Sequence, residues 1–347
     1  MKNILIAGSI ALLASLLLTL ALFRLNDIGS FNLKNEDVYV EKLSVCGWLP
    51  WWDYENAVSE YAENEEVFDT VSPFIYSLET DGEIALKIDD ENSITGFREG
   101  TEVIPSISNE FDGERVSVII NNTEETDKHI SDVVELVNRN NFNGIELDYE
   151  YLIAEDKDEY SEFIRRLSQQ LHDNSKKLVV TLHPKTTDKG TWHAAEAQDW
   201  EELAKHADKL RVMAYDFSWE ESNPGPISPY PWFKKVLIYS KKKIPKEKLV
   251  FGVGLYGYDW VEGGTRAQDK TLVEVNGLIQ KHKGELNYNN KDRSPSFIYK
   301  EQEGSHVVWY ENELSLDSKV ELLIKEGISN ICIWRLGGTP REIFDIF

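Results

Sequence analysis

Short apolar runs and helical patterns alternate along most of this 347-residue chain, and this alternation restricts the fold more than any other feature. Eight runs have the length and composition of β-strands, at residues 44–49, 71–77, 102–108, 144–149, 177–183, 209–215, 249–255 and 330–334. Helical patterns lie between most of them, at residues 127–138, 158–172, 200–206, 232–241 and 318–326. This order predicts a parallel sheet of α/β class, and eight units in about 250 residues have the size of a (β/α)8 TIM barrel.

One connection is too long for a single helix. It joins the seventh and eighth predicted strands, and its residues 258–311 contain short β-like runs separated by Gly and Asn. We expect a small α+β insertion there, on the side of the barrel where active-site loops lie. A disordered excursion is the alternative, but Phe297, Tyr299, Trp309 and Tyr310 argue against it.

The N-terminal segment is apolar enough to direct the chain out of the cytoplasm. Residues 4–23 contain no charged side chain, and Lys2 and Arg24 flank them. This length matches the apolar core of a bilayer, which favours an uncleaved anchor helix over a cleaved signal peptide in residues 1–25. We expect residues 26–40 to form a linker and residues 41–347 to form the barrel, either membrane-anchored or secreted.

Charge and aromatic content limit the partners of the chain. A formal net charge of −24 repels nucleic acids and anionic lipids, so nucleic acid is not an expected partner and membrane contact is expected only through the N-terminal segment. Ten Trp residues supply flat apolar rings that suit sugars, although a large core would also use them. Neither a metal nor another cofactor is expected, because no residues have metal-ligand spacing, and we expect a monomer.

Two cysteines, Cys46 and Cys332, lie on the first and last predicted strands. These strands are neighbours in a closed barrel, which allows a disulfide between them. Because a disulfide also requires suitable geometry, two buried free thiols are the favoured interpretation.

Three acidic residues alternate with hydrophobic residues in the fourth predicted strand. Residues 143–150 read Asn-Gly-Ile-Glu-Leu-Asp-Tyr-Glu, with the acids at Glu146, Asp148 and Glu150. Alternate side chains of a strand share a face, and the outer face of a barrel strand packs on helices. The acids are therefore expected inside the barrel, with Glu150 at its C-terminal mouth. A solvated edge strand is the alternative, but similar strands on both sides disfavour an edge position.

Neighbouring carboxylates inside a barrel favour acid chemistry. Like charges at this spacing cannot all stay ionised in a poorly solvated site, so some of their pKa values must rise. Cleavage of a glycosidic bond requires an acid that protonates the leaving oxygen and a group that stabilises the oxocarbenium-like centre. Glu150, at the mouth and beside other acids, is suited to hold that proton near neutral pH.

The acid strand resembles that of the family 18 glycoside hydrolases, the chitinase-like barrels, which ends in Asp-Gly-x-Asp-x-Asp-x-Glu. The last Asp and the Glu match at Asp148 and Glu150, whereas Asn143 and Glu146 replace the first two acids.

Other segments agree with this family in order and position. Met-Ala-Tyr-Asp at 213–216 matches its Met-x-Tyr-Asp, and Trp334 matches the Trp that ends its eighth strand. Ser-Ile-Ser-Asn at 106–109 lacks the glycines of its Ser-x-Gly-Gly. The spore-germination branch, of the cortex-lytic N-acetylglucosaminidase type, is matched more closely, in residues 47–53, 224–226, 231–232 and 252–260.

The resemblance implies a substrate-assisted mechanism. Glu150 would protonate the glycosidic oxygen while the 2-acetamido oxygen of the substrate attacks the anomeric carbon. Asp148 would orient the acetamide, Tyr215 would donate a hydrogen bond to its oxygen, and Asp216 would help to bind the sugar. Glu146 would lie below Asp148 and share a proton with it.

The resemblance and the predicted strand ends together give a set of candidate substrate-binding residues. Trp334 would form the floor under the sugar, with a core role as the alternative. Trp48, Trp219 and Tyr256 lie at or after strand ends, where they would line the cleft or pack loops. His183 ends the fifth predicted strand, where a sugar contact and a structural hydrogen bond are equally compatible with the pattern.

Three functions are compatible with these residues. The leading hypothesis is a hydrolase of N-acetylglucosaminyl linkages in peptidoglycan, in spore cortex or cell wall. A chitinase or chito-oligosaccharide hydrolase is an alternative within the same class. A chitinase-like sugar-binding protein with impaired catalysis is an alternative from another class, which Asn143, Glu146 and Asn109 favour and Glu150 opposes.

Overall fold

The computed structural model describes residues 42–90, 94–189, 192–302 and 304–347. The anchor or signal peptide predicted at 1–25 and the linker predicted at 26–40 lie outside these residues. In the described ranges, no helix combines the length and the apolar character that a membrane crossing requires.

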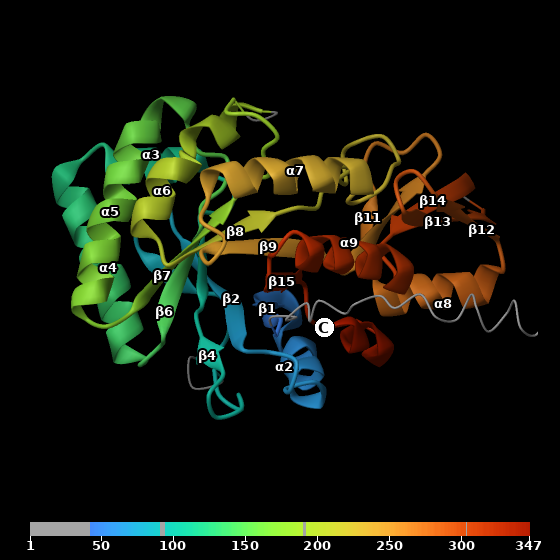
Figure 1. Ribbon diagram of the computed structural model, residues 1–347, viewed down its shortest axis with the longest axis horizontal. Coiled ribbons are helices and arrows are strands. Elements are labelled where there is room, and N and C mark those ends of the chain that lie inside the picture. The colour runs from blue at the N-terminus through green and yellow to red at the C-terminus, as the bar shows by residue number, and fades with distance from the viewer. Residues whose placement is uncertain (1–41, 91–93, 190–191, 303) are drawn as a thin grey trace, which may run out of the picture. The chain divides into compact units, whose positions relative to one another are not determined.

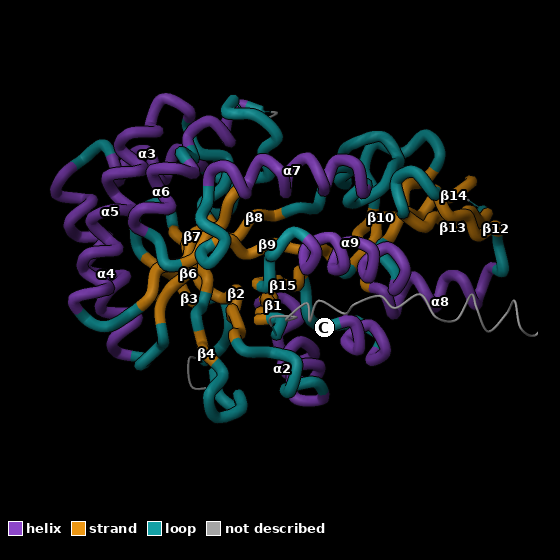
Figure 2. The backbone as a smooth tube through the Cα atoms, in the orientation of Figure 1, coloured by secondary structure: helices purple, strands orange, loops and turns teal. Residues whose placement is uncertain are grey.

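The described residues are built around a closed barrel of eight parallel strands, drawn in orange in Figure 2. The strands follow one another as β1, β2, β5, β6, β7, β8, β9 and β15, and pairing of β15 with β1 closes the barrel. This confirms the predicted barrel. The bounds are β1 Ser44–Pro50, β2 Thr70–Leu78, β5 Ser106–Ser108, β6 Gly144–Asp148, β7 Lys177–Leu182, β8 Lys209–Met213, β9 Leu249–Gly254 and β15 Asn330–Trp334.

The third predicted strand, at residues 102–108, is interrupted. It forms two pieces, β4 (Glu102–Val103) and β5, with Pro105 between them. Pro105 has no backbone N–H to donate, although its carbonyl oxygen accepts the N–H of Glu146 at 2.8 Å. A short strand that the sequence did not predict, β3 (Ile84–Leu86), pairs antiparallel with β2.

Helices cover the outside of the barrel (Figure 1). Four of them begin at side-chain caps, where a side-chain oxygen accepts a backbone N–H of the first turn: Asp112 caps α3, Asn122 α4, Asp199 α6 and Asn312 α9. All five predicted helices are present, as α4, α5, α6, α7 and α9, whereas α2 and α3 were not predicted. Their bounds are α2 Tyr54–Glu63, α3 Gly113–Ile120, α4 Thr123–Arg139, α5 Lys157–Asp173, α6 Trp200–His206, α7 Tyr230–Lys243 and α9 Glu313–Lys325.

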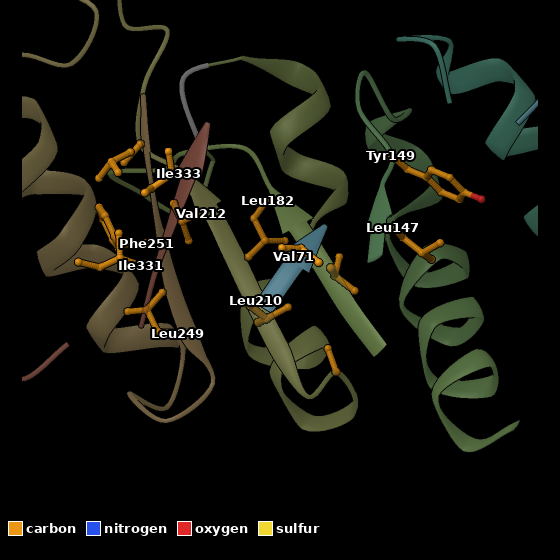
Figure 3. Close-up of a cluster of buried hydrophobic side chains, with 14 of the residues drawn as sticks. Val71, Leu147, Tyr149, Leu182, Leu210, Val212, Leu249, Phe251, Ile331 and Ile333 are labelled. Carbon is orange, nitrogen blue, oxygen red and sulfur yellow. The ribbon is translucent and has the colours of Figure 1, made fainter. Parts of the chain in front are cut away.

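Hydrophobic side chains of the strands pack against these helices (Figure 3). Leu147 and Tyr149 lie on the outer face of β6 and are 0% and 1% exposed. The Tyr149 hydroxyl is 2.7 Å from His129 Nε2 of α4, and its ring stacks on Phe163 of α5. This packing fixes the outer face of β6, so the alternate side chains of the strand point into the barrel.

A second sheet lies between β9 and β15 in the chain, drawn in orange to red in Figure 1. Its five antiparallel strands have the order β11-β10-β14-β13-β12, and one helix, α8, accompanies them. The sheet begins at Tyr256, two residues before the predicted start of the insertion. The bounds are β10 Tyr256–Val261, β11 Gln268–Thr271, α8 Leu272–His282, β12 Glu285–Asn289, β13 Ser294–Glu301 and β14 Gly304–Tyr310.

Cys46 and Cys332 form a disulfide between β1 and β15. The favoured prediction of two free thiols is therefore wrong. The register of the two strands places the cysteines directly opposite each other, with their Cα atoms 4.4 Å apart. The sequence could place both residues on neighbouring strands, but it could not give this register.

Candidate active site

The three acids of β6 lie as the alternation predicts. Glu146 and Asp148 point into the barrel and are 0% and 5% exposed. Glu150 follows the C-terminal end of the strand, and 18% of its side chain is exposed. The carboxyl groups therefore run from the barrel interior to its mouth.

Glu146 is held by four donors from four different strands. Its Oε1 accepts a hydrogen bond from Thr181 Oγ1 at 2.6 Å. Its Oε2 accepts from Trp48 Nε1 at 2.9 Å, Ser106 Oγ at 2.5 Å and Arg211 Nη1 at 2.6 Å. The described hydrogen bonds include none between Glu146 and Asp148, so the predicted sharing of a proton between them is replaced by an ion pair with Arg211.

Arg211 is a buried cation that the sequence analysis missed. It is 3% exposed, donates to Ser72 Oγ at 2.5 Å, and lies over the Trp48 ring with its guanidinium carbon 5.3 Å from the centroid. A signal was available, because β8 carries Arg211 between two buried hydrophobic residues and so points it into the barrel.

Burial and neighbouring charge raise the pKa of Asp148 to about 8. Burial contributes most, the Glu146 charge adds to it, and Arg211 offsets part of the increase. Asp148 Oδ1 is buried and accepts no hydrogen bond from the described residues. Asp148 therefore has an acceptor oxygen available and a pKa close to neutral pH.

Glu150 has the environment of a proton donor. Burial first, and then the charges of Asp148 and Asp216, raise its pKa well above the ordinary value of a glutamate. The imidazole of His183 is a neighbouring base, with its Nδ1 3.6 Å from Glu150 Oε2. Burial and Lys185 lower the pKa of His183 to about 3, so this imidazole is neutral and leaves the proton on Glu150.

Tyr215 and Asp216 follow β8 and face the same mouth. The hydroxyl groups of Tyr256 and Tyr258, both on β10, donate to Asp216 Oδ1. Burial raises the pKa of Asp216 to about 6, and these two hydrogen bonds limit the increase. Tyr256, predicted as a substrate contact, therefore connects the second sheet to Asp216. The Tyr215 ring is nearly parallel to that of Trp334, at 6.5 Å.

Trp334 lies among aromatic side chains at the barrel mouth. Its ring centroid is 5.5 Å from that of Phe74 and 6.2 Å from that of Trp52. The structure corrects the prediction for Trp48, which lies deeper and is 1% exposed. Trp48 supports Glu146 through its indole N–H, since β1 points the ring into the barrel instead of toward solvent.

Exposed aromatic side chains surround the mouth of the barrel. Trp219, a predicted substrate contact, is 39% exposed. His183 is only 5% exposed and packs edge-on against Trp192, at a centroid distance of 4.6 Å. The other exposed aromatic residues on loops after strand ends are Trp51, Trp52, Phe111, Tyr151 and Phe217.

A pocket continues from the mouth toward the second sheet. It is lined by Trp52, Leu255, Tyr256, Tyr258, Asp269, Lys270, Thr271, Trp334, Arg335 and Gly337. A larger hollow lies between α4 and α5 on the outside of the barrel, and none of the strand-end residues described above lines it. The chemistry of the molecule is therefore concentrated at the mouth.

Residues 76–338 match the family model of the glycosyl hydrolases family 18. The uncharacterised glycosylase YvbX of Bacillus subtilis is 31% identical over 237 residues, which cover 68% of this chain and 69% of YvbX. The cortical fragment-lytic enzyme of Bacillus anthracis is 30% identical over 241 residues, which cover 68% of this chain and 56% of that enzyme. The chain thus matches little more than half the length of the latter.

Solved structures agree with these matches. The spore cortex-lytic enzyme SleL of Bacillus cereus is 25% identical, with a TM-score of 0.80 over 88% of this chain and 73% of that chain. The family match covers the acid strand, β8 and Trp334, and the relatives include a lytic enzyme, so this chain is a glycoside hydrolase. The protein belongs to glycoside hydrolase family 18.

Proposed function

We propose that this enzyme hydrolyses N-acetylglucosaminyl linkages in the peptidoglycan of spore cortex or cell wall. The observation that carries the proposal is the pair of acids at the mouth, Asp148 and Glu150, both with raised pKa values and both close enough to Tyr215 for their charges to raise its pKa. In such a pair, Glu150 is the proton donor and Asp148 is the carboxyl group that stabilises positive charge on the substrate.

In the first step, Glu150 transfers its proton to the glycosidic oxygen. The bond between that oxygen and the anomeric carbon breaks, and the leaving sugar keeps the electron pair. The acetamide oxygen of the substrate bonds to the same carbon, which gives an oxazolinium ion. Asp148 in its ionised form accepts a hydrogen bond from the acetamide N–H at Oδ1, which has no partner among the described residues, and its negative charge stabilises the positive charge that develops on the acetamide.

In the second step, water attacks the anomeric carbon and opens the oxazolinium ring. Glu150, now a carboxylate, takes a proton from this water and returns to its starting state. Two displacements at the same carbon retain its configuration, and the enzyme itself forms no covalent bond. The mechanism requires an N-acetyl group, which defines the substrate class.

The identity of the polymer is supported by the relatives. A cortical fragment-lytic enzyme and a sporulation-specific glycosylase align over most of the barrel, at 30% and 27% identity. The endochitinase of Brugia malayi aligns at 22% identity, so chitin is the second candidate. Exposed aromatic rings around the mouth suit either polymer.

We also propose that the enzyme works outside the cytoplasm, as a monomer that is secreted or held by its N-terminal apolar segment. The Cys46–Cys332 disulfide supports this location, because disulfides persist mainly in oxidising compartments.

The test compares the full-length protein with Glu150→Gln on cortex peptidoglycan and on chito-oligosaccharides. The proposal predicts new reducing ends from cortex that carry N-acetylglucosamine, so borohydride reduction followed by acid hydrolysis should give glucosaminitol. It also predicts a loss of activity of about 10²-fold to 10⁴-fold in the variant, since general acid catalysis is worth that much. Glu155→Gln is the matched control, because this exposed acid lies in the same loop.

Each outcome has a defined meaning. Faster cleavage of chito-oligosaccharides than of cortex would favour the chitinase alternative. Binding without turnover would favour the sugar-binding alternative. Full activity in Glu150→Gln would remove this residue from the role of acid.

A further inference from the structure

The backbone of Glu150 lies beyond the hydrogen-bonded ladders that hold β6. Pairing of β6 with β5 ends at Ser108 and Asp148, and pairing with β7 ends at Leu147 and Val180. The neighbouring strands β5 and β7 therefore supply no ladder partner for the N–H or the carbonyl oxygen of Glu150. Backbone polar groups in such a position need other partners.

The side chain of Asn109 supplies both partners. Its Oδ1 accepts the Glu150 N–H at 2.9 Å, and its Nδ2 donates to the Glu150 carbonyl oxygen at 2.7 Å. Asn109 is 0% exposed and directly follows β5. Its amide thus takes the place of a peptide group in a neighbouring strand and continues the hydrogen bonding of β6 to Glu150.

A third hydrogen bond connects this amide to the loop after β5, because Asn109 Nδ2 also donates to the Asp112 carbonyl oxygen at 3.0 Å. The two loops are in backbone contact, since a Cβ on Gly113 would lie 2.1 Å from the Tyr151 carbonyl oxygen. Tyr151 itself has a φ of 54°, so the chain turns immediately after Glu150. The direction of the Glu150 side chain therefore depends on this junction.

We propose that Asn109 is the positioning residue for Glu150, which it holds at the place from which the acid reaches the glycosidic oxygen. This inference rests on the proposed function. In the Ser-x-Gly-Gly pattern that residues 106–109 resemble, this position is a glycine, which has no side chain to make these bonds.

The test measures kcat and KM on cortex fragments for Asn109→Ala and Asn109→Asp. Alanine removes all three hydrogen bonds, whereas aspartate has nearly the same shape but, when ionised, cannot donate to the two carbonyl oxygens. We expect kcat to fall on the order of a hundredfold in both variants, as for a misplaced catalytic group, with KM changed less than about threefold. The alkaline limb of the kcat profile, which reports loss of the acid proton, should also move.

A matched control exists at the opposite end of the same strands. Asn143, directly before β6, is exposed, and its Oδ1 accepts the N–H of Val103 at 2.8 Å, so its side chain connects β4 to the start of β6 through a single hydrogen bond. Asn143→Ala should lower thermal stability and leave the pH profile of kcat unchanged. A purely structural role for Asn109 predicts the same behaviour for both asparagines.

A second measurement separates positioning from binding. A tetramer of N-acetylglucosamine should bind to Glu150→Gln and to the double variant Asn109→Ala/Glu150→Gln with equal affinity, within about threefold, because the acid is already absent. If the wild type turns over cortex and kcat is unchanged in both Asn109 variants, the positioning role of Asn109 is overturned, whereas the proposed function still holds. Absence of turnover in the wild type would overturn the proposed function as well.

Discussion

Glu146 shows how one additional methylene group is accommodated in a packed barrel layer. The family pattern has an aspartate here, and a longer carboxylate could displace Asp148 from its position. The structure instead gives Glu146 an ion pair with Arg211 and three neutral donors. Arg211 thereby supplies a counter-charge and lowers the pKa that Asp148 would otherwise have.

The first prediction concerns this buried pair. Arg211→Met keeps the volume of the side chain but leaves the Glu146 charge without a counter-charge, and breaking such a pair costs about 3–5 kcal/mol in the free energy of unfolding. Urea denaturation at pH 7 measures the effect. Lys241→Met, which breaks the surface pair with Glu326, is the control and should change stability little. Equal stabilities of the two variants would contradict this account.

At the scale of elements, the sequence predicted the eight barrel strands and five of the helices around them, because hydrophobic periodicity reports which face of an element is buried. Features that depend on partners distant in the chain were missed. Arg211 lies 65 residues from Glu146 and Asn109 lies 41 residues from Glu150, and no local pattern indicates either contact. The antiparallel order of the second sheet also depends on pairing that composition does not specify.

One strand of the second sheet is hydrogen-bonded to the site. β10 carries Tyr256 and Tyr258, and both hydroxyl groups donate to Asp216. These bonds favour the carboxylate, whereas burial favours the protonated form and raises the pKa of Asp216 to about 6. The insertion therefore contributes to the charge state of a residue on the barrel.

A second prediction tests this connection. Tyr256→Phe removes a hydrogen bond to the Asp216 carboxylate, so the pKa of Asp216 should rise further. Under the proposed function, Asp216 binds the sugar in its ionised form, so the acidic limb of kcat/KM should move from about pH 6 to higher pH. Tyr258→Phe, which loses a bond of 3.1 Å, should shift the limb less in the same direction. An unchanged limb in Tyr256→Phe would show that the hydroxyl does not influence Asp216.

For the described residues as a whole, the barrel depends on the contact between its first and last strands. β1 and β15 are separated by most of the chain, and their pairing is the step that closes the sheet. The Cys46–Cys332 disulfide lies at this seam and joins residues 286 positions apart. It therefore restricts the unfolded chain much more than a local cross-link would, in the chain-entropy description of such bonds.

The third prediction concerns this seam. Replacing both cysteines by alanine should lower the free energy of unfolding by about 2–5 kcal/mol, the usual effect of losing a native disulfide. Activity at 25 °C should be retained, because neither cysteine is among the donors that hold Glu146. Urea denaturation of the oxidised wild type, the reduced wild type and the double variant separates the bond from the packing of the side chains. If the bond itself stabilises the barrel, reduction and replacement lower stability by similar amounts, whereas a loss confined to the alanine variant would assign the effect to packing around Trp48 and Val250.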